Sequence, residues 1–239
     1  AFAALKAGDI LYVRGGTYHL SQTIKVNQTG TADKRICVFA YPGDTERPVF
    51  DFSGQPRSTS TEAASYRGVM HNIGANYWHY RGLDFCHAAD NGMKLEGSYC
   101  VVELCRFYGN EDTGLQQGFG KDSKGNNTRN TEFKYGRNNI IVNCDAYDNN
   151  DPWTHGGNAD GFAIKLYPGP GNEFHGCRAW HNSDDGWDLY YTVFPIVVDN
   201  CWVLNNGLDK GNANGFKMGG CKQGGTSTGA HVFKNCIAA

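Results

Sequence analysis

The chain has 239 residues and a formal net charge of −2; 40% of its residues are apolar and 19% are charged. This balance excludes a protein that binds nucleic acid through bulk positive charge, so we expect no nucleic-acid partner. No apolar run approaches the ~20 residues that a membrane-spanning helix needs, and we expect no membrane partner either. The 32 glycines and 22 asparagines are poor helix formers and disfavour a helix bundle.

The N-terminal part of the chain contains short apolar segments separated by glycine-rich or proline-containing turns. Residues 7–20 read AGDILYVRGGTYHL, and residues 35–52 read RICVFAYPGDTERPVFDF. Segments of this length between such turns are typical of β-strands. We expect them to form the first coils of the repeating structure that the rest of the chain predicts.

A repeat organises the chain from about residue 80 onward. Six cysteines stand in similar short apolar segments: Cys86, Cys105, Cys144, Cys177, Cys201 and Cys236. Five residues after each of the first five comes an asparagine: Asn91, Asn110, Asn149, Asn182 and Asn206. A second segment then opens with glycine: Gly92, Gly114, Gly161, Gly186 and Gly215.

The spacing of this repeat predicts the fold class. The glycines are 22, 47, 25 and 29 residues apart, so the unit has 22–29 residues, and one coil carries an excursion over about residues 115–140. Each unit contains two or three short strands and no helical period. The pattern predicts an all-β chain folded as a parallel β-helix, a solenoid whose coils stack strand on strand. We expect residues 1–239 to form a single domain.

Stacking gives the repeated residues a structural role. Equivalent residues lie ~4.8 Å apart in such a stack, so the asparagines are predicted to form a hydrogen-bonded ladder at a bend. The cysteines are predicted to be buried free thiols in an interior column. Because the chain ends one strand into a new coil and an open sheet edge is unfavourable, we expect a truncation, with further coils or a cap beyond Ala239.

Alternation along the glycine-led strands separates inward from outward side chains. The residue after each glycine is apolar and is expected to face inward: Met93, Leu115, Phe162, Trp187 and Phe216. The next residue is mostly polar and is expected to face outward: Lys94, Gln116, Ala163, Asp188 and Lys217. Within this set, Lys94 is interpreted as a solvated surface lysine.

Four acidic residues gather on two adjacent coils: Asp160, Asp184, Asp185 and Asp188. An aspartate pair at a turn usually caps a bend. Four carboxylates in register, however, repel one another unless a cation neutralises them or some stay protonated. Oxygen ligands without histidine or cysteine favour calcium (Ca²⁺), so we predict a calcium site.

Lys217 occupies the position of Asp188 one coil further along the chain. Metal proximity and partial burial would both favour its neutral amine, although the carboxylates leave the sign of its pKa shift open. Lys165 and Tyr190 share the outward face and are candidates for contact with a substrate.

Three motifs resemble those of the family-9 polysaccharide lyases, which are right-handed parallel β-helices. They are NADGF (158–162), NSDDGWDLY (182–190) and NGFKMGG (214–220), and they occur together with the repeated asparagines. The resemblance implies that Asp160, Asp184, Asp185 and Asp188 hold calcium and that Lys217 is the catalytic base. It also implies β-elimination on a pectic polysaccharide, either polygalacturonate or rhamnogalacturonan.

The chemistry of that reaction agrees with these residue types. A calcium ion neutralises the uronate carboxylate and stabilises the enolate-like intermediate, while a neutral lysine removes the C5 proton. We therefore expect an alkaline optimum. A polymeric substrate implies a secreted or periplasmic enzyme, and we expect a monomer.

Two other functions remain open at this point. An inverting β-helix glycoside hydrolase, similar to polygalacturonases, would use Asp160, Asp184 and Asp185 as acid and base without calcium. A non-catalytic carbohydrate-binding β-helix would explain the asparagines, but not the acidic cluster beside Lys217.

Overall fold

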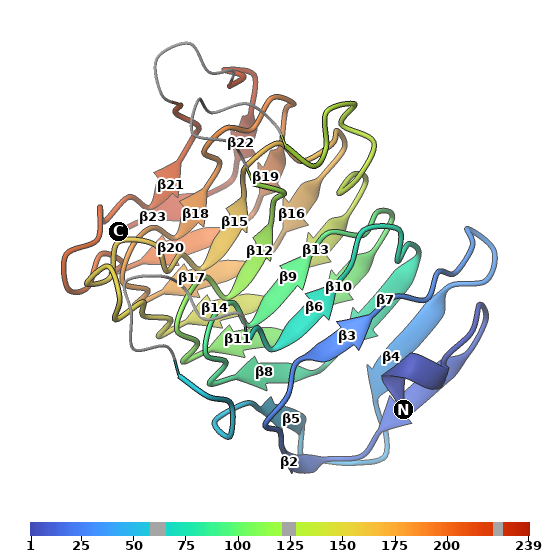
Figure 1. Cartoon of the computed structure of the whole chain (residues 1–239). Helices are drawn as coiled ribbons and strands as arrows, with labels where there is room; N and C mark the ends of the chain where they lie inside the picture. The colour runs from blue at the N-terminus through green and yellow to red at the C-terminus, as the bar shows by residue number, and fades with distance from the viewer. Residues whose placement is uncertain (58–65, 121–127, 222–226) are drawn as a thin grey trace.

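The computed structural model describes residues 1–57, 66–120, 128–221 and 227–239. Its strands form three parallel sheets, and each coil of the chain adds one strand to each sheet in turn (Figure 1). The one helical element of the described residues is a 3₁₀ turn, η1 (Phe2–Ala4). None of the helical structure in this part of the chain is long or apolar enough to cross a membrane.

The strands of the three sheets are as follows. The first sheet contains β1 (Ile10–Val13), β4 (Ile36–Ala40), β7 (Trp78–Arg81), β10 (Val101–Glu103), β13 (Ile140–Val142), β16 (Glu173–His175), β19 (Val197–Asp199) and β22 (Val232–Lys234). The second contains β2 (Gly16–His19), β5 (Pro48–Asp51), β8 (Asp84–Cys86), β11 (Arg106–Tyr108), β14 (Asp145–Tyr147), β17 (Arg178–Trp180), β20 (Trp202–Leu204) and β23 (Ile237–Ala238). The third contains β3 (Ile24–Val26), β6 (Val69–His71), β9 (Met93–Leu95), β12 (Leu115–Gln117), β15 (Phe162–Ile164), β18 (Trp187–Asp188) and β21 (Phe216–Lys217).

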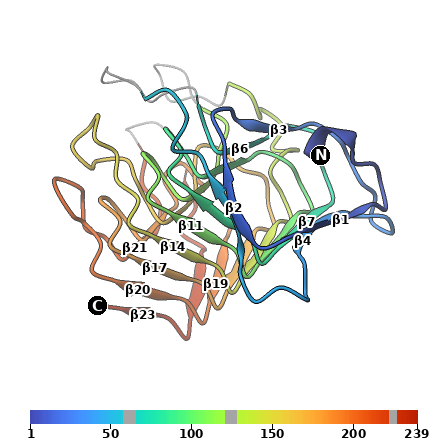
Figure 2. The ribbon, with the colours of Figure 1, turned by 90° about the horizontal axis from the view of Figure 1, so that it is seen from below.

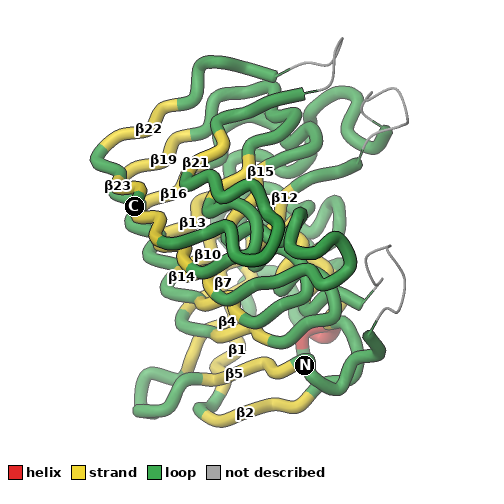
Figure 3. Tube along the Cα trace, turned by 90° about the vertical axis from the view of Figure 1, so that its left-hand side faces the viewer, coloured by secondary structure: helices red, strands yellow, loops and turns green. Residues whose placement is uncertain are grey.

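This arrangement confirms the predicted parallel β-helix. Figure 2 shows the second sheet with β11 to β23 side by side, and Figure 3 shows the first sheet rising from β1 to β22. The two N-terminal segments supply β1 with β2 and β4 with β5, so they are the first coils, as predicted. Part of the predicted excursion, residues 121–127, lies outside the described residues.

The core lies between the three sheets and is built from columns of stacked apolar side chains. One column contains the parallel rings of Phe50, Phe85 and Phe107, whose centroids are 5.4 and 5.5 Å apart. Another contains Trp187, which packs against Phe162 at 4.8 Å and Phe216 at 5.2 Å. Short strands are enough to hold the coils together, because burying each ring stabilises the fold by ~1.5–3 kcal/mol and each coil adds a further buried ring.

The asparagine ladder is present, and it starts one coil later than predicted. Each side-chain amide donates to the side-chain oxygen of the next asparagine, from Asn110 to Asn149 at 2.9 Å, to Asn182 at 2.8 Å and to Asn206 at 2.8 Å. The residue before each of these asparagines has a positive φ: Gly109, Asp148, His181 and Asn205. The left-handed residue makes the bend, and the asparagine that follows satisfies the backbone groups that the bend frees.

The prediction that Asn91 belongs to this ladder was wrong. The position below Asn110 is taken by Ala88, whose backbone N–H donates to Asn110 Oδ1 at 3.0 Å. The side-chain amide of Asn91 donates instead to Gln116 Oε1 at 2.9 Å. The cause is the register of β8, which places Cys86 opposite Tyr108 and Asp84 opposite Arg106.

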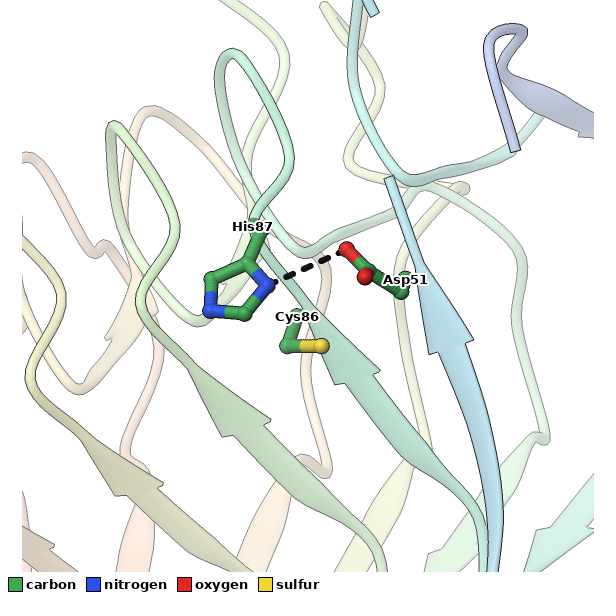
Figure 4. A group of neighbouring side chains, drawn as sticks. All are labelled: Asp51, Cys86 and His87. Atoms are coloured by element: carbon green, nitrogen blue, oxygen red, sulfur yellow. Dashed lines mark hydrogen bonds and ion pairs between the residues drawn. The ribbon is translucent and has the colours of Figure 1, made fainter. Parts of the chain in front are cut away.

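The cysteines are all free thiols, as predicted, but one of them leaves the interior column. The strand registers align Cys105, Cys144, Cys177, Cys201 and Cys236. Cys86 is shifted from this column by three residues and lies beside Asp51 and His87 on the second sheet (Figure 4). Its similarity to the other cysteine segments reflects composition rather than position in the coil.

Replacing the central ladder residue should destabilise the protein strongly. Asn149 is fully buried; it donates to Phe107 O and Asn182 Oδ1 and accepts from the backbone and side-chain N–H groups of Asn110. Each buried group left without a partner costs ~1–3 kcal/mol, so we expect Asn149→Ala to lower the free energy of unfolding by about 3–5 kcal/mol. Urea unfolding of the wild type and the variant measures this difference in the free energy of unfolding.

Asn206→Ala is the matched control, because Asn206 is the last residue of the ladder and is only half-buried, so water can replace its partners. We expect its loss to be about 1 kcal/mol. Equal losses at the two positions would contradict the role of the ladder.

Candidate functional site

The candidate site lies on the outward face of the third sheet, where strand pairing aligns the predicted residues. Ala163 of β15 is opposite Asp188 of β18, which is opposite Lys217 of β21. The residues before these positions, Phe162 and Trp187, are buried in the core. Since side chains alternate along a strand, the apolar packing of these rings holds Asp188 and Lys217 on the opposite face.

Three of the four predicted carboxylates converge. Asp160, Asp185 and Asp188 each offer an oxygen within 4.8 Å of the others. Asp160 and Asp185 precede successive strands, and the backbone N–H of Asp185 donates to Asp160 Oδ1 at 3.3 Å. Asp184 is the chain neighbour of Asp185, and its Oδ1 accepts the backbone N–H of Asn212 at 2.6 Å.

Two lysine amines reach into the carboxylate cluster. Lys165 Nζ lies 2.7 Å from Asp160 Oδ2 and 3.1 Å from Asp188 Oδ2. Lys217 Nζ lies 3.1 Å from Asp185 Oδ2 and 3.4 Å from Asp188 Oδ2. Asp188 is therefore shared by both lysines, and its other oxygen accepts the backbone N–H of Tyr190 at 2.8 Å.

These groups line an open cavity of about 410 Å³. Tyr190 forms part of its wall, and Lys217 Nζ lies 5.6 Å from the centre of the tyrosine ring. Its lining brings together the predicted base Lys217, the predicted substrate contacts Lys165 and Tyr190, and two of the predicted calcium ligands, Asp184 and Asp188. Asp160 and Asp185 are fully buried and are paired with the lining residues Lys165 and Lys217.

Burial and charge shift the pKa values of these groups in opposite directions. Desolvation raises the pKa of Asp160 well above its usual range, and it also raises the pKa of Asp184. Desolvation alone would lower the pKa of Lys217, but Asp188, Asp185 and Asp160 together raise it above its ordinary value. The carboxylates thus determine the direction of the pKa shift of Lys217, which the sequence left open.

The residues present fit a divalent cation. Four carboxylates against two ammonium groups leave an excess of two negative charges when all are ionised, and the converging donors are all oxygens, which Ca²⁺ prefers. The two amines already occupy positions beside the oxygens, so the cluster attracts positive charge in its present form. Asp160, Asp185 and Asp188 would hold the ion, with Asp184 adjacent.

Several lining residues were missed by sequence reasoning. Asp112, Asn158 and Asn212 also face the cavity, as does Gln116, which was expected to face outward but was not assigned to the site. Asp112 stands two residues before Gly114, as Asp184 stands two residues before Gly186. Its position in the repeat could therefore have identified Asp112 as a residue of the site. Asn158 and Asn212 come from turns, where the repeat predicts no orientation.

The interpretation of Lys94 as a solvated surface lysine was wrong. It occupies the predicted column, opposite Gln116, but is only 8% exposed. Desolvation, together with the nearby charge of Arg67, lowers its pKa to about 8 despite the acidic groups around it. Arg67 and Arg129 lie with Lys94 in the wall of a second, neighbouring cavity.

A second group with metal-binding residue types, Asp51, Cys86 and His87, lies on the second sheet (Figure 4). His87 Nδ1 lies 3.1 Å from Asp51 Oδ1, and His19 Nδ1 lies 3.2 Å from Asp51 Oδ2. Burial raises the pKa of the Cys86 thiol to about 12, so it stays protonated at neutral pH. The hydrogen bond of His87 to Asp51 and the ion-pair contact of His19 with the same carboxylate account for this cluster.

Comparison with known proteins identifies the family of the chain. A family model described as the Pel9A-like, right handed beta helix region matches residues 1–239. Pectate lyase L of Thermoclostridium stercorarium is 37% identical, over 100% of this chain and 18% of the relative. The crystal structure of pectate lyase Pel9A superposes with a TM-score of 0.76 at 31% identity, over 100% of this chain and 55% of that chain.

A rhamnogalacturonan lyase superposes almost as well, with a TM-score of 0.75 at 27% identity, over 99% of this chain and 61% of that chain. The chain thus spans less than two thirds of the length of each of these proteins. The matched family model covers every residue and also gives the hand of the solenoid. The chain therefore belongs to the Pel9A-like right-handed β-helix family, the family-9 polysaccharide lyases that its motifs resemble.

Proposed function

We propose that this chain carries the active site of a calcium-dependent lyase that cleaves pectic uronate polymers by β-elimination. The observation that carries the proposal is the convergence of Asp160, Asp185 and Asp188 within 4.8 Å beside the amine of Lys217. The similarity to a pectate lyase and a rhamnogalacturonan lyase supports a pectic substrate. A polymer of this kind implies a secreted or periplasmic site of action.

The reaction requires removal of a proton next to a carboxylate. When bound, calcium supplies the positive charge that neutralises the uronate carboxylate and so makes the C5 proton more acidic. Lys217 takes that proton with its neutral amine. The C4–O bond then breaks, a C4–C5 double bond forms, and water protonates the departing oxygen.

The two lysines of the site have different roles because they are held differently. Lys165 has the shorter ion pairs and a 13% exposed side chain, and Asp160, Asp188 and Asp112 outweigh its desolvation and raise its pKa well above the ordinary value. Lys217 has longer ion pairs and a 26% exposed side chain. Lys217 therefore releases its proton more readily and faces the substrate, which supports its role as base.

Lys165 stays positively charged and is proposed to bind the substrate together with Tyr190. Its ammonium lies in the cavity wall beside Asp188, where it can pair with a sugar carboxylate or hydroxyl. Tyr190 offers an aromatic face next to Lys217, and such faces pack against sugar rings.

The spacing of the carboxylates argues against the inverting hydrolase. Such enzymes separate their two carboxyl groups by ~6.5–9.5 Å to leave room for water. Among the candidates for that acid and base, Asp160 and Asp185 bring their oxygens within 4.8 Å of each other. Incubation with polygalacturonate and with rhamnogalacturonan distinguishes the functions. A lyase forms an unsaturated product that absorbs ultraviolet light, whereas a hydrolase forms reducing ends without this absorbance. A non-catalytic binding protein forms neither product.

Replacement of the base should abolish catalysis without removing the metal. We expect Lys217→Ala to lower kcat by about 10²–10⁴-fold, the range for losing a general base, while calorimetry still detects calcium binding. Lys234→Ala is the matched control, because Lys234 pairs with Asp199 on the first sheet, outside the cavity. Full activity of Lys217→Ala would remove this residue as the base.

Removal of calcium should stop the reaction reversibly. A chelator is expected to abolish the ultraviolet signal, and added calcium should restore it, because the uronate charge is then neutralised again. Asp185→Asn removes one charge from the cluster while Asn214 keeps a hydrogen-bonding partner there. We expect this variant to need at least tenfold more calcium for half-maximal rate. Unchanged activity in chelator would contradict the calcium requirement.

The rate should rise with pH. Because Asp188, Asp185 and Asp160 together raise the pKa of Lys217, most of its amine is protonated at neutral pH, and the reactive fraction grows as the pH increases. We expect log kcat/KM to rise with a slope approaching one on the acidic side of an alkaline plateau. A maximum at acidic pH would contradict a lysine base.

A further inference from the structure

A second cavity, of about 310 Å³, continues the candidate site along the third sheet. Asp112, Gln116 and Leu166 line both cavities, so the two form one groove over the outward face. Lys94 lies in the second cavity and occupies the same column as Lys217, separated by four strand pairings. At ~4.8 Å per pairing, the two lysines stand roughly 19 Å apart along the solenoid.

Lys94 is the unusual group of this second cavity. It is 92% buried, and no hydrogen bond or ion pair within the described parts of the chain reaches its amine. Lys165 and Lys217, in the neighbouring cavity, each have two ion pairs of 3.4 Å or less. Burying an ammonium without a partner is costly, so the three donors of Lys94 have a strong affinity for an anion in the groove.

Of the three acidic groups that act on Lys94, Glu96 and Asp90 are paired with arginines, and Asp112, which lines both cavities, forms no ion pair with Lys94 within the described residues. Arg129 donates to both oxygens of Glu96, at 2.9 and 2.8 Å. Arg67 lies 3.3 Å from Asp90 Oδ2 and donates to an amide oxygen at 3.1 Å. These pairs fix the two guanidinium groups in the wall of the second cavity and leave the charge of Lys94 uncompensated by contact.

We propose that Lys94, flanked by Arg67 and Arg129, binds a carboxylate of the uronate polymer several sugars away from the one that faces Lys217. This inference rests on the proposed function, since it places one polymer chain along both cavities. A uronate backbone carries carboxylates at many sugars, so it can present one to each end of the groove at once. The pKa of about 8 for Lys94 agrees with an amine that becomes fully charged when an anion arrives.

The test compares long and short substrates. Lys94→Gln removes the charge and keeps a similar shape; we expect KM for polygalacturonate to rise about tenfold with kcat unchanged, as for the loss of a charged hydrogen bond. A uronate trimer is too short to reach from Lys217 to Lys94, so its KM should not change. Lys25→Gln is the matched control, because Lys25 is an exposed lysine in the same column, two strands before Lys94.

Each outcome decides the proposal. An unchanged KM for the polymer, or an equal rise for polymer and trimer, overturns the subsite while the proposed function stands. If the wild-type protein eliminates no uronate polymer, the proposed function fails, and the subsite is judged by native electrophoresis in gels containing polygalacturonate. There, loss of retardation in Lys94→Gln supports the subsite and equal retardation overturns it. Circular dichroism of each variant verifies the fold.

Discussion

The vertical register of the parallel strands is the constraint on which the rest of the molecule depends. Backbone hydrogen bonds fix one residue of each coil above its equivalent in the coil before, so each position of the repeat becomes a column. The inner columns hold stacked rings, and the bend holds the asparagine ladder. The outward column of the third sheet includes Lys94, Asp188 and Lys217, to which we assign roles in the proposed function. A slip of one residue in any strand would turn its core side chain outward and its functional side chain inward.

The charges of the candidate site are tolerated because core packing and ion pairs act together. Trp187 is fully buried between Phe162 and Phe216, and this packing fixes the position of Asp188 along the axis of the solenoid. Asp188 then shares its carboxylate with two ammonium groups. A cluster of this kind is weak evidence for stability, since desolvation offsets much of the ionic attraction. The cation and the anionic substrate of the proposed function would complete the charge balance of this cluster.

The fold class and the inward and outward positions of the third sheet could be predicted from the sequence. In a repeat, equivalent residues recur at matching positions of each unit, so the strand register can be inferred from the spacing alone. The prediction failed at Asn91 and Cys86, where a segment resembles the others in composition but is displaced by three residues in the coil. It also failed at Lys94, whose burial depends on neighbours such as Arg129. That neighbour comes from a turn segment with no counterpart in other coils, and only the three-dimensional arrangement brings it near. Distances between oxygens, such as those of Asp160 and Asp188, are likewise set by side-chain conformation rather than by spacing along the chain.

The columnar construction has a consequence for how such a groove changes during evolution. Each coil contributes one outward residue to the groove, so its length is set in whole units, with ~4.8 Å per coil. Duplication or deletion of an entire coil between β9 and β15 would change the separation of the two ends by one unit and leave the local chemistry at each end intact. Under the proposed function, selection could adjust the length of the bound ligand through the number of coils, without changing the residues assigned to the reaction.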